Sequence, residues 1–185
     1  MDELRVRRMI ARRIASLLVP MLIVIGLDRL SKWWVRANLW DPPRDLVILP
    51  GWLELTPVAN RGIAFGMLQD TGAVLALVAV VALAFVALRS WRQVLTAPAL
   101  VRIPLGMIAG GAIGNVIDRA QIGYVTDFIR VPRIWIFQVF NVSDAAIVVG
   151  TVILALVLWR GENRTARIRT AEPLTTTPGP TTSPE

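Results

Sequence analysis

Four long apolar segments alternate with polar ones along the chain, and this pattern predicts membrane-spanning helices. The expected spans cover approximately residues 14–35, 71–88, 99–118 and 142–159. Of the 185 residues, 55% are hydrophobic and only 18% are charged, which is far more apolar than an ordinary soluble domain. We therefore expect an all-α membrane bundle of four transmembrane helices, which forms one domain over residues 14–160.

The loops between the spans carry strand-forming patterns. In the first large loop, residues 36–70, "DLVILPGWLELTPV" places β-formers around a Pro-Gly turn signal and predicts a hairpin lying on the membrane surface. In the second, residues 119–141, "GYVTDFIRV" and "RIWIFQVFN" also have the character of strands. We expect a small extracytoplasmic β-rich platform on the helices. The segment 161–185 ends in a Thr/Pro-rich tail without an apolar pattern and is expected to be a disordered cytoplasmic tail.

The placement of arginine predicts the orientation of the spans. Twelve arginines lie in residues 1–13, 89–102 and 160–169, against six in residues 36–61 and 119–133. Because cytoplasmic segments carry an excess of Lys and Arg, we expect both termini in the cytoplasm and both large loops outside. The net charge of +7 therefore fits anionic lipid headgroups better than nucleic acid. No small-residue cleavage site follows the basic N-terminal segment, so the first span is expected to remain uncleaved.

The residue types that are absent limit the chemistry. Without Cys, the chain has no disulfide, thiolate nucleophile or Cys-ligated metal site, and without His it has no Ser-His-Asp triad or HExxH metal site. Lys32 is the single lysine. Acid–base chemistry must therefore use carboxylates, Lys32, Tyr124, backbone groups or water. We expect no metal and no organic cofactor.

Three of the spans have uncharged runs that are short for a membrane. Residues 14–27, 103–117 and 145–159 hold 14, 15 and 15 residues, whereas a helix needs about 20 to cross the hydrocarbon. Arg13, Arg102 and Arg160 bound the cytoplasmic ends, and their side chains are long enough to snorkel to water. Asp28, Asp118 and Asp144 bound the outer ends, and their side chains are too short to do so. These carboxylates need protein partners or a wet cavity.

The predicted topology brings these carboxylates to the same membrane depth as several other polar residues. Eight side chains from three helices and a loop are expected near the outer face: Asp28, Lys32, Asn115, Asp118, Arg119, Asp127, Asn141 and Asp144. Two carboxylates in a poorly hydrated pocket cannot both ionise cheaply, so their proton affinities separate. One acid can then activate water while the other, protonated, binds a substrate carbonyl, as in aspartic proteases.

Each of these residues also has a purely structural interpretation. Asp28 and Lys32 are four residues apart in the favourable order for a helical ion pair, and Asp118 could similarly pair with Arg119. Asn115 and Asn141 could satisfy backbone groups at helix ends. Asp144 could be an acid at a helix N-terminus, stabilised by the helix dipole.

Glycines recur in "GMIAGGAIG" at four-residue intervals, at Gly106, Gly110 and Gly114. Such a face of small residues allows helices to approach closely. We expect it to bring the ends of the third and fourth spans together.

Four linked motifs are similar to those of one known family. "DRLSK", "VANRGIAFGML", "GGAIGNVIDRAQIGYVTDF" and "FNVSDAAIVVG" resemble, in order and spacing, the motifs of lipoprotein signal peptidase (signal peptidase II), a bacterial intramembrane aspartyl protease. The resemblance covers about residues 14–160. It implies four transmembrane helices in the bacterial inner or plasma membrane, with both termini cytoplasmic and the active site near the outer face.

The resemblance also implies roles for individual residues. Asp127 of "VTDF" and Asp144 of "NVSD" would form the catalytic dyad. Supporting and substrate-binding positions would be Asp28, Lys32, Asn60, Gly62, Phe65, Gly114, Asn115, Asp118, Arg119 and Asn141. The enzyme would act, without a cofactor, on prolipoproteins in the lipid bilayer and cleave before the diacylglyceryl-modified cysteine; we expect a monomer that binds no nucleic acid.

The chain departs from the family's motifs at two positions. The usual "NxGAAF" reads "NRGIAF", with the bulkier Ile63, and the usual "NxAD" reads "NVSD", with Ser143 beside Asp144. Neither change removes a residue of the dyad, so we expect an effect on substrate preference.

Three other functions remain open at this stage. A small ion or proton transporter could use intramembrane carboxylates, although a relay needs acids at several depths. A Ser/Lys hydrolase would have to use Lys32 with Ser31 or Ser143. A non-catalytic assembly protein would tolerate replacement of the acids by amides.

Overall fold

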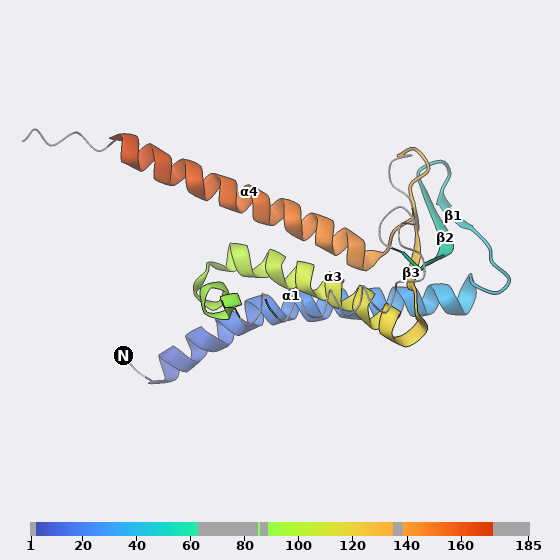
Figure 1. Ribbon diagram of the computed structural model, residues 1–185, viewed down its shortest axis with the longest axis horizontal. Helices are drawn as coiled ribbons and strands as arrows, with labels where there is room; N and C mark the ends of the chain where they lie inside the picture. The colour runs from blue at the N-terminus through green and yellow to red at the C-terminus, as the bar shows by residue number, and fades with distance from the viewer. Residues whose placement is uncertain (1–2, 63–84, 86–88, 135–138, 172–185) are drawn as a thin grey trace, which may run out of the picture.

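Three long helices and a small antiparallel sheet make up the described fold (Figure 1). The computed structural model describes residues 3–62, 85, 89–134 and 139–171. The helices are α1 (Glu3–Asn38), α3 (Ala99–Ile122) and α4 (Val142–Ala171), and the strands are β1 (Leu46–Leu49), β2 (Leu53–Asn60) and β3 (Val125–Arg130).

Each of the three helices is long and apolar enough to cross a membrane over the segments Glu3–Asn38, Ala99–Ile122 and Val142–Arg160. They correspond to the first, third and fourth predicted spans, and α1 and α4 extend beyond the predicted ends. The second predicted span, residues 71–88, lies outside the described residues apart from Phe85. Large apolar side chains such as Leu22 and Leu30 are exposed on the helices, as expected for surfaces that face lipid.

Helix α3 packs along both α1 and α4 (Figure 1). A Cβ at Gly110 would lie 2.6 Å from the Met21 carbonyl oxygen of α1, and one at Gly106 would collide with the Leu17 carbonyl. These two glycines therefore allow α1, not α4, to approach. Gly111 instead lies against Ser143 of α4. The prediction that the Gly106–Gly110–Gly114 face joins the third and fourth spans is thus wrong for Gly106 and Gly110. The side of α3 that carries these two glycines faces α1, and Gly111 lies on the side that faces α4.

Arg102, at the start of α3, is buried rather than extended to water. Its guanidinium donates to the Ser16 hydroxyl at 2.7 Å, to the Leu95 carbonyl at 3.3 Å and to the Ala97 carbonyl. The Leu95 carbonyl lies in the last turn of the helical segment 89–96 and the Ala97 carbonyl directly after it. The last carbonyls of a helix have no partner within the helix. The expectation that this arginine snorkels is therefore wrong, because it caps the turn that leads into α3.

The sheet has the strand order β1-β2-β3 and lies at the C-terminal end of α1 and the N-terminal end of α4 (Figure 1). The hairpin expected from the Pro-Gly turn is confirmed, with Val47 opposite Glu54. The strand predicted in "GYVTDFIRV" is also confirmed, and its Asp127 lies opposite Val58. Of the last predicted strand, residues 135–138 lie outside the described residues, while Phe140 pairs with Ile129.

A small apolar core attaches the sheet to α1. Val35, Leu39 and Phe128 are buried together, and Leu55 and Val142 pack against them. Because Val142 is the first residue of α4, this core also fixes where α4 begins relative to β3. The end of α1, the start of α4 and the strands β2 and β3 are thereby held together.

Candidate active site

The N-terminus of α4 is closed by a reciprocal pair of hydrogen bonds between Asn141 and Asp144. The Asp144 backbone N–H donates to Asn141 Oδ1 at 2.9 Å, and the Asn141 backbone N–H donates to Asp144 Oδ2 at 3.2 Å. This is a capping box, in which a cap residue and the third helical residue satisfy each other's free N–H groups. The interpretation of Asn141 and Asp144 as helix-end residues is therefore confirmed, and the cap fixes the Asp144 carboxylate in space.

Asp127 projects from β3 and is almost completely buried, with 3% of its surface exposed. Its Oδ2 accepts from the Asn60 side-chain amide at 2.9 Å, and its Oδ1 accepts from the Asn141 side-chain amide at 2.7 Å. The register of the sheet brings Asn60 there, since it lies opposite Val125, two residues before Asp127. One amide from β2 and one from the start of α4 therefore hold the two oxygens of this carboxylate.

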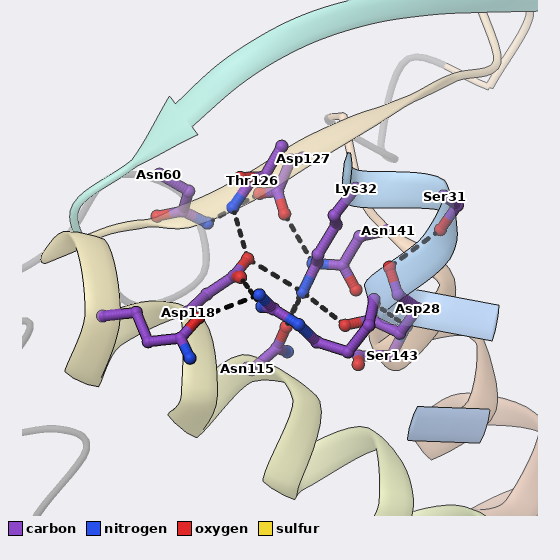
Figure 2. Close-up of polar contacts among 12 residues, drawn as sticks. Asp28, Ser31, Lys32, Asn60, Asn115, Asp118, Thr126, Asp127, Asn141 and Ser143 are labelled. Carbon is purple, nitrogen blue, oxygen red and sulfur yellow. Dashed lines mark hydrogen bonds and ion pairs between the residues drawn. The ribbon is translucent and has the colours of Figure 1, made fainter. Parts of the chain in front are cut away.

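Asn115 of α3 completes the connection between the acids. Its Nδ2 donates to Asp144 Oδ1 at 2.7 Å, while its Oδ1 accepts from Asn141 Nδ2 and from Lys32 Nζ, both at 3.1 Å. Asn141 thus contacts both carboxylates, one through its side chain and the other through the cap. Figure 2 shows Asn115, Asn141 and Asp127 converging from different elements.

Burial changes the proton affinity of Asp127. Loss of hydration raises its pKa to about 6, and the negative charge of Asp144 acts in the same direction. The hydrogen bonds from Asn60 and Asn141 and the charge of Lys32 oppose this rise because they favour the ionised form. Asp127 therefore takes up a proton far more readily than an exposed aspartate.

A separate group of ionic contacts adjoins this network, and Figure 2 shows its members Asp28, Lys32 and Asp118. Lys32 Nζ is 2.8 Å from Asp28 Oδ2 and 3.1 Å from Asp118 Oδ2, and all three side chains are fully buried. The predicted pair Asp28–Lys32 is confirmed. Asp118 also contacts Arg29 Nη1 at 2.5 Å. The ionic partners of Asp118 therefore lie on α1.

The possible pairing of Asp118 with Arg119 is wrong. Arg119 instead donates to the Gly62 carbonyl at 2.9 Å. Consecutive residues of a helix point about 100° apart, so one turns toward α1 while the other turns toward the end of β2. The Gly62 backbone N–H also donates to Asn60 Oδ1 at 3.1 Å, which orients the amide that holds Asp127.

Most of the predicted site residues meet in this region, and one cannot be placed. Gly114 allows a close approach, since a Cβ there would lie 2.8 Å from Asp28 Oδ2 and collide with the Ser143 hydroxyl. Phe65 lies outside the described residues, as does Ile63. Within the described part of the chain, no group of three acids is arranged to hold a metal ion.

The sequence interpretation did not single out three residues that contact this network: Arg29, Arg36 and Thr126. Ser143, which the sequence indicated only as a departure from the motif and as a possible nucleophile, also joins the network through its backbone. The Ser143 backbone N–H donates to Asp28 Oδ1 at 3.0 Å, which attaches α4 to α1. Arg29 and Thr126 stand inside the quoted motifs "DRLSK" and "VTDF". Their spacing could have indicated them, because each neighbours a singled-out acid, but their partners come from distant segments.

Comparison with known proteins decides the family. Residues 20–160 match the family described as signal peptidase (SPase) II. The chain belongs to the lipoprotein signal peptidase family. Lipoprotein signal peptidases from Moorella thermoacetica and Syntrophomonas wolfei are 41% and 39% identical to it over 143 and 137 residues. These alignments cover 76% and 74% of this chain and 92% and 88% of the relatives.

Solved structures have the same fold. A bacterial membrane enzyme determined in meso at 2.3 Å superposes with a TM-score of 0.66 and 20% identity, covering 89% of this chain and 96% of the other. A second such enzyme, at 1.9 Å, also gives 0.66 with 21% identity and covers 78% and 93%. This member of the family is thus a multi-pass membrane protein and a protease of lipoprotein processing, and the relatives named here are bacterial.

Proposed function

We propose that this protein is an aspartyl endopeptidase in which Asp127 and Asp144 form the catalytic dyad. The observation that carries the proposal is the shared contact of Asn141, whose side-chain amide donates to Asp127 while its backbone N–H and Oδ1 bond to Asp144. The two acids are therefore held in one network whose donors are neutral amides. Family membership supports the proteolytic function, and the absence of Cys and His from the sequence favours acid chemistry.

In this proposal the pair carries one proton, which resides mainly on Asp127 because burial raises its pKa to about 6. Asp144 is partly exposed and would accept a proton from the attacking water. Water oxygen would bond to the scissile carbonyl carbon while Asp127 protonates the carbonyl oxygen. In the collapse, the C–N bond would break, Asp144 would protonate the leaving nitrogen, and a hydroxyl proton would return to Asp127.

The proposed substrate is a prolipoprotein cleaved before its diacylglyceryl-modified cysteine. The diacylglycerol would hold the substrate in the outer leaflet and fix the scissile bond at the depth of the dyad, which lowers the entropic cost of orientation. Arg119, Gly62 and Asn60 would border the peptide. We propose a monomer that requires no cofactor and does not bind nucleic acid.

The proposed topology has four spans, with both termini in the cytoplasm of a bacterial inner or plasma membrane. The peptidase domain would cover residues 14–160 between a basic segment, 1–13, and a cytoplasmic tail, 161–185. The arginine distribution supports this orientation. The N-terminal end of α1 and the C-terminal end of α4 also lie away from the sheet, which would place the sheet and the dyad at the outer face (Figure 1).

The rival functions find less support in this geometry. A proton relay would need acids spaced through the membrane, whereas Asp28, Asp118, Asp127 and Asp144 lie in one connected region. A Ser/Lys mechanism would need Lys32 as a free base, yet its Nζ contacts two carboxylates. The Ser31 hydroxyl donates to the Asp28 carbonyl at 3.0 Å.

The dyad is tested by replacing each acid with its isosteric amide. We expect Asp127→Asn and Asp144→Asn each to abolish processing of a diacylglyceryl prolipoprotein, followed as a gel shift with purified enzyme in lipid. Asp45→Asn, which changes an exposed acid in the first large loop, is the matched control and should process normally. Processing by both dyad variants, folded and at normal levels, would contradict the proposal and favour a Ser/Lys or non-catalytic function.

A further inference from the structure

Strand β3 is buried on both of its faces around Asp127. Val125, Thr126, Asp127 and Phe128 are 2%, 0%, 3% and 4% exposed. Because successive side chains of a strand point to opposite faces, Thr126 and Phe128 lie on the face away from Asp127. The position of Asp127 therefore depends on what holds this other face.

Polar contacts hold Thr126 from two helices. Its backbone N–H donates to Asp118 Oδ2 of α3 at 3.0 Å, a contact drawn in Figure 2. Its hydroxyl accepts from Arg36 Nη1 of α1 at 2.8 Å, and the same Nη1 lies 3.5 Å from Asp118 Oδ1. Thr126, Asp118 and Arg36 thus form a closed triangle that joins β3 to both helices.

An apolar contact holds the next residue on the same face. Phe128 packs with Val35 of α1, which precedes Arg36, and with Leu39, the residue that follows the end of α1. The residues immediately before and after Asp127 are therefore both attached to the same stretch of α1. This two-point attachment opposes both a sliding of β3 and a rotation that would turn Asp127 away from its amide partners.

We propose that Thr126 and Arg36 are positioning residues, which act through β3 to hold the Asp127 carboxylate at its catalytic location. This inference rests on the proposed dyad, since it requires Asp127 to take part in the reaction. Thr126 acts through its hydroxyl, which accepts the hydrogen bond from Arg36. A valine has the same shape but lacks this hydroxyl. Arg36 supplies the N–H that donates to this hydroxyl. A shorter side chain at position 36 would remove this bond and leave β3 free to shift.

The hydroxyl is tested with Thr126→Val and Thr126→Ser. Thr126→Val should lower kcat about tenfold with little change in KM, because small displacements of a catalytic group reduce the rate steeply. Thr126→Ser keeps the hydroxyl and should recover most of kcat. Thr56→Val is the matched control: its hydroxyl is buried in the same sheet without a hydrogen-bond partner among the described residues, so its rate should not change.

Arg36 allows an independent test because its side chain is partly exposed, so we expect its replacement to leave the fold intact. Arg36→Gln should lower kcat to a similar extent, and Thr126→Val combined with it should add little further loss, since both changes break one contact. Additive losses, or unchanged kcat in either single variant, would overturn the inference. Asp127→Asn, assayed in parallel, separates the two proposals: an inactive Asp127→Asn beside a fully active Thr126→Val leaves the dyad standing and rejects the positioning role.

Discussion

Two pairs of acids lie next to each other where the helices meet the sheet, and they are held in different ways. Asp28 and Asp118 contact the ammonium group of Lys32, and Asp118 also contacts Arg29. Asp127 and Asp144 accept instead from the side-chain amides of three asparagines and from one backbone N–H. The first pair balances charge with charge, whereas the hydrogen-bond donors described around the second are neutral.

This difference distinguishes a structural role for the first pair from the proposed catalytic role of the second. A cation fixes a buried carboxylate strongly but favours its ionised form. An amide N–H also fixes the carboxylate but favours its ionised form less strongly than a cation does, so the carboxylate can still gain or lose a proton during a reaction. Asn115 is the point where the two pairs meet, because it accepts from Lys32 and donates to Asp144. The ionic pair can therefore position the proposed dyad without contacting it.

The largest effect is expected where the ionic pair loses its cation. Lys32→Met leaves Asp28 and Asp118 buried with less compensation, and we expect the free energy of unfolding to fall by about 3–5 kcal/mol. Thermal unfolding in detergent, or the yield of folded protein, measures the loss. Adding Asp28→Asn should recover part of it, since the amide oxygen can still accept from the Ser143 backbone N–H. A Lys32→Met protein as stable as the unchanged one would show that charge balance does not hold this pair.

The next effect concerns the amide that joins the dyad. Asn141→Ala removes the bond to Asp127 and the cap of α4, so we expect about a hundredfold loss of activity together with about 1 kcal/mol of stability. Asn141→Ser should lose the activity alone, because serine is a good N-cap residue but lacks the amide N–H groups.

Comparison of the two variants by processing rate and thermal unfolding separates the two roles of Asn141. Equal stability losses in Asn141→Ala and Asn141→Ser would mean that the cap depends on more than a side-chain acceptor. Full activity in Asn141→Ser would show that the bond to Asp127 is dispensable. The proposed link between amide donors and the function of the dyad would then be wrong.

The sequence predicted both pairs of acids as one polar cluster because the lengths of the apolar runs limit where charges can lie. It also predicted the hairpin and β3, since turn signals and β-formers act locally. It could not predict which acid takes which partner. Asp118 has Arg119 as its chain neighbour, but Lys32 and Arg29, more than eighty residues away, lie closer in the fold.

Helix packing explains the other errors. A four-residue glycine spacing predicts that a close contact exists but does not identify the neighbouring helix, and Gly111 outside that spacing provides the contact with Ser143. The burial of Arg102 likewise depends on the carbonyls of Leu95 and Ala97, at and directly after the end of the helical segment 89–96. The attachment of Thr126 to Arg36 joins residues ninety positions apart. Only the assembled fold determines these contacts.

The smallest effect tests whether amide donors leave the pKa of Asp127 adjustable. The Asn60 N–H favours the ionised form of Asp127, so Asn60→Leu should raise its pKa further above the value of about 6. In the proposed mechanism Asp127 must be protonated, and activity is lost as pH rises through its pKa. The alkaline side of the pH–rate profile should therefore move to higher pH, with about tenfold lower activity at the optimum because the carboxyl loses one of the two amides that hold it in place.

The direction of that movement separates the two possible roles of Asp127. If Asp127 were the ionised base, a raised pKa would move the acid side of the profile to higher pH and leave the alkaline side in place. Asn38→Leu, which replaces an exposed asparagine bonded to the Trp34 carbonyl, is the matched control and should move neither side. A shift confined to the acid side would assign the proton to Asp144 and reverse the proposed roles, while the difference between amide-held and cation-held acids would remain.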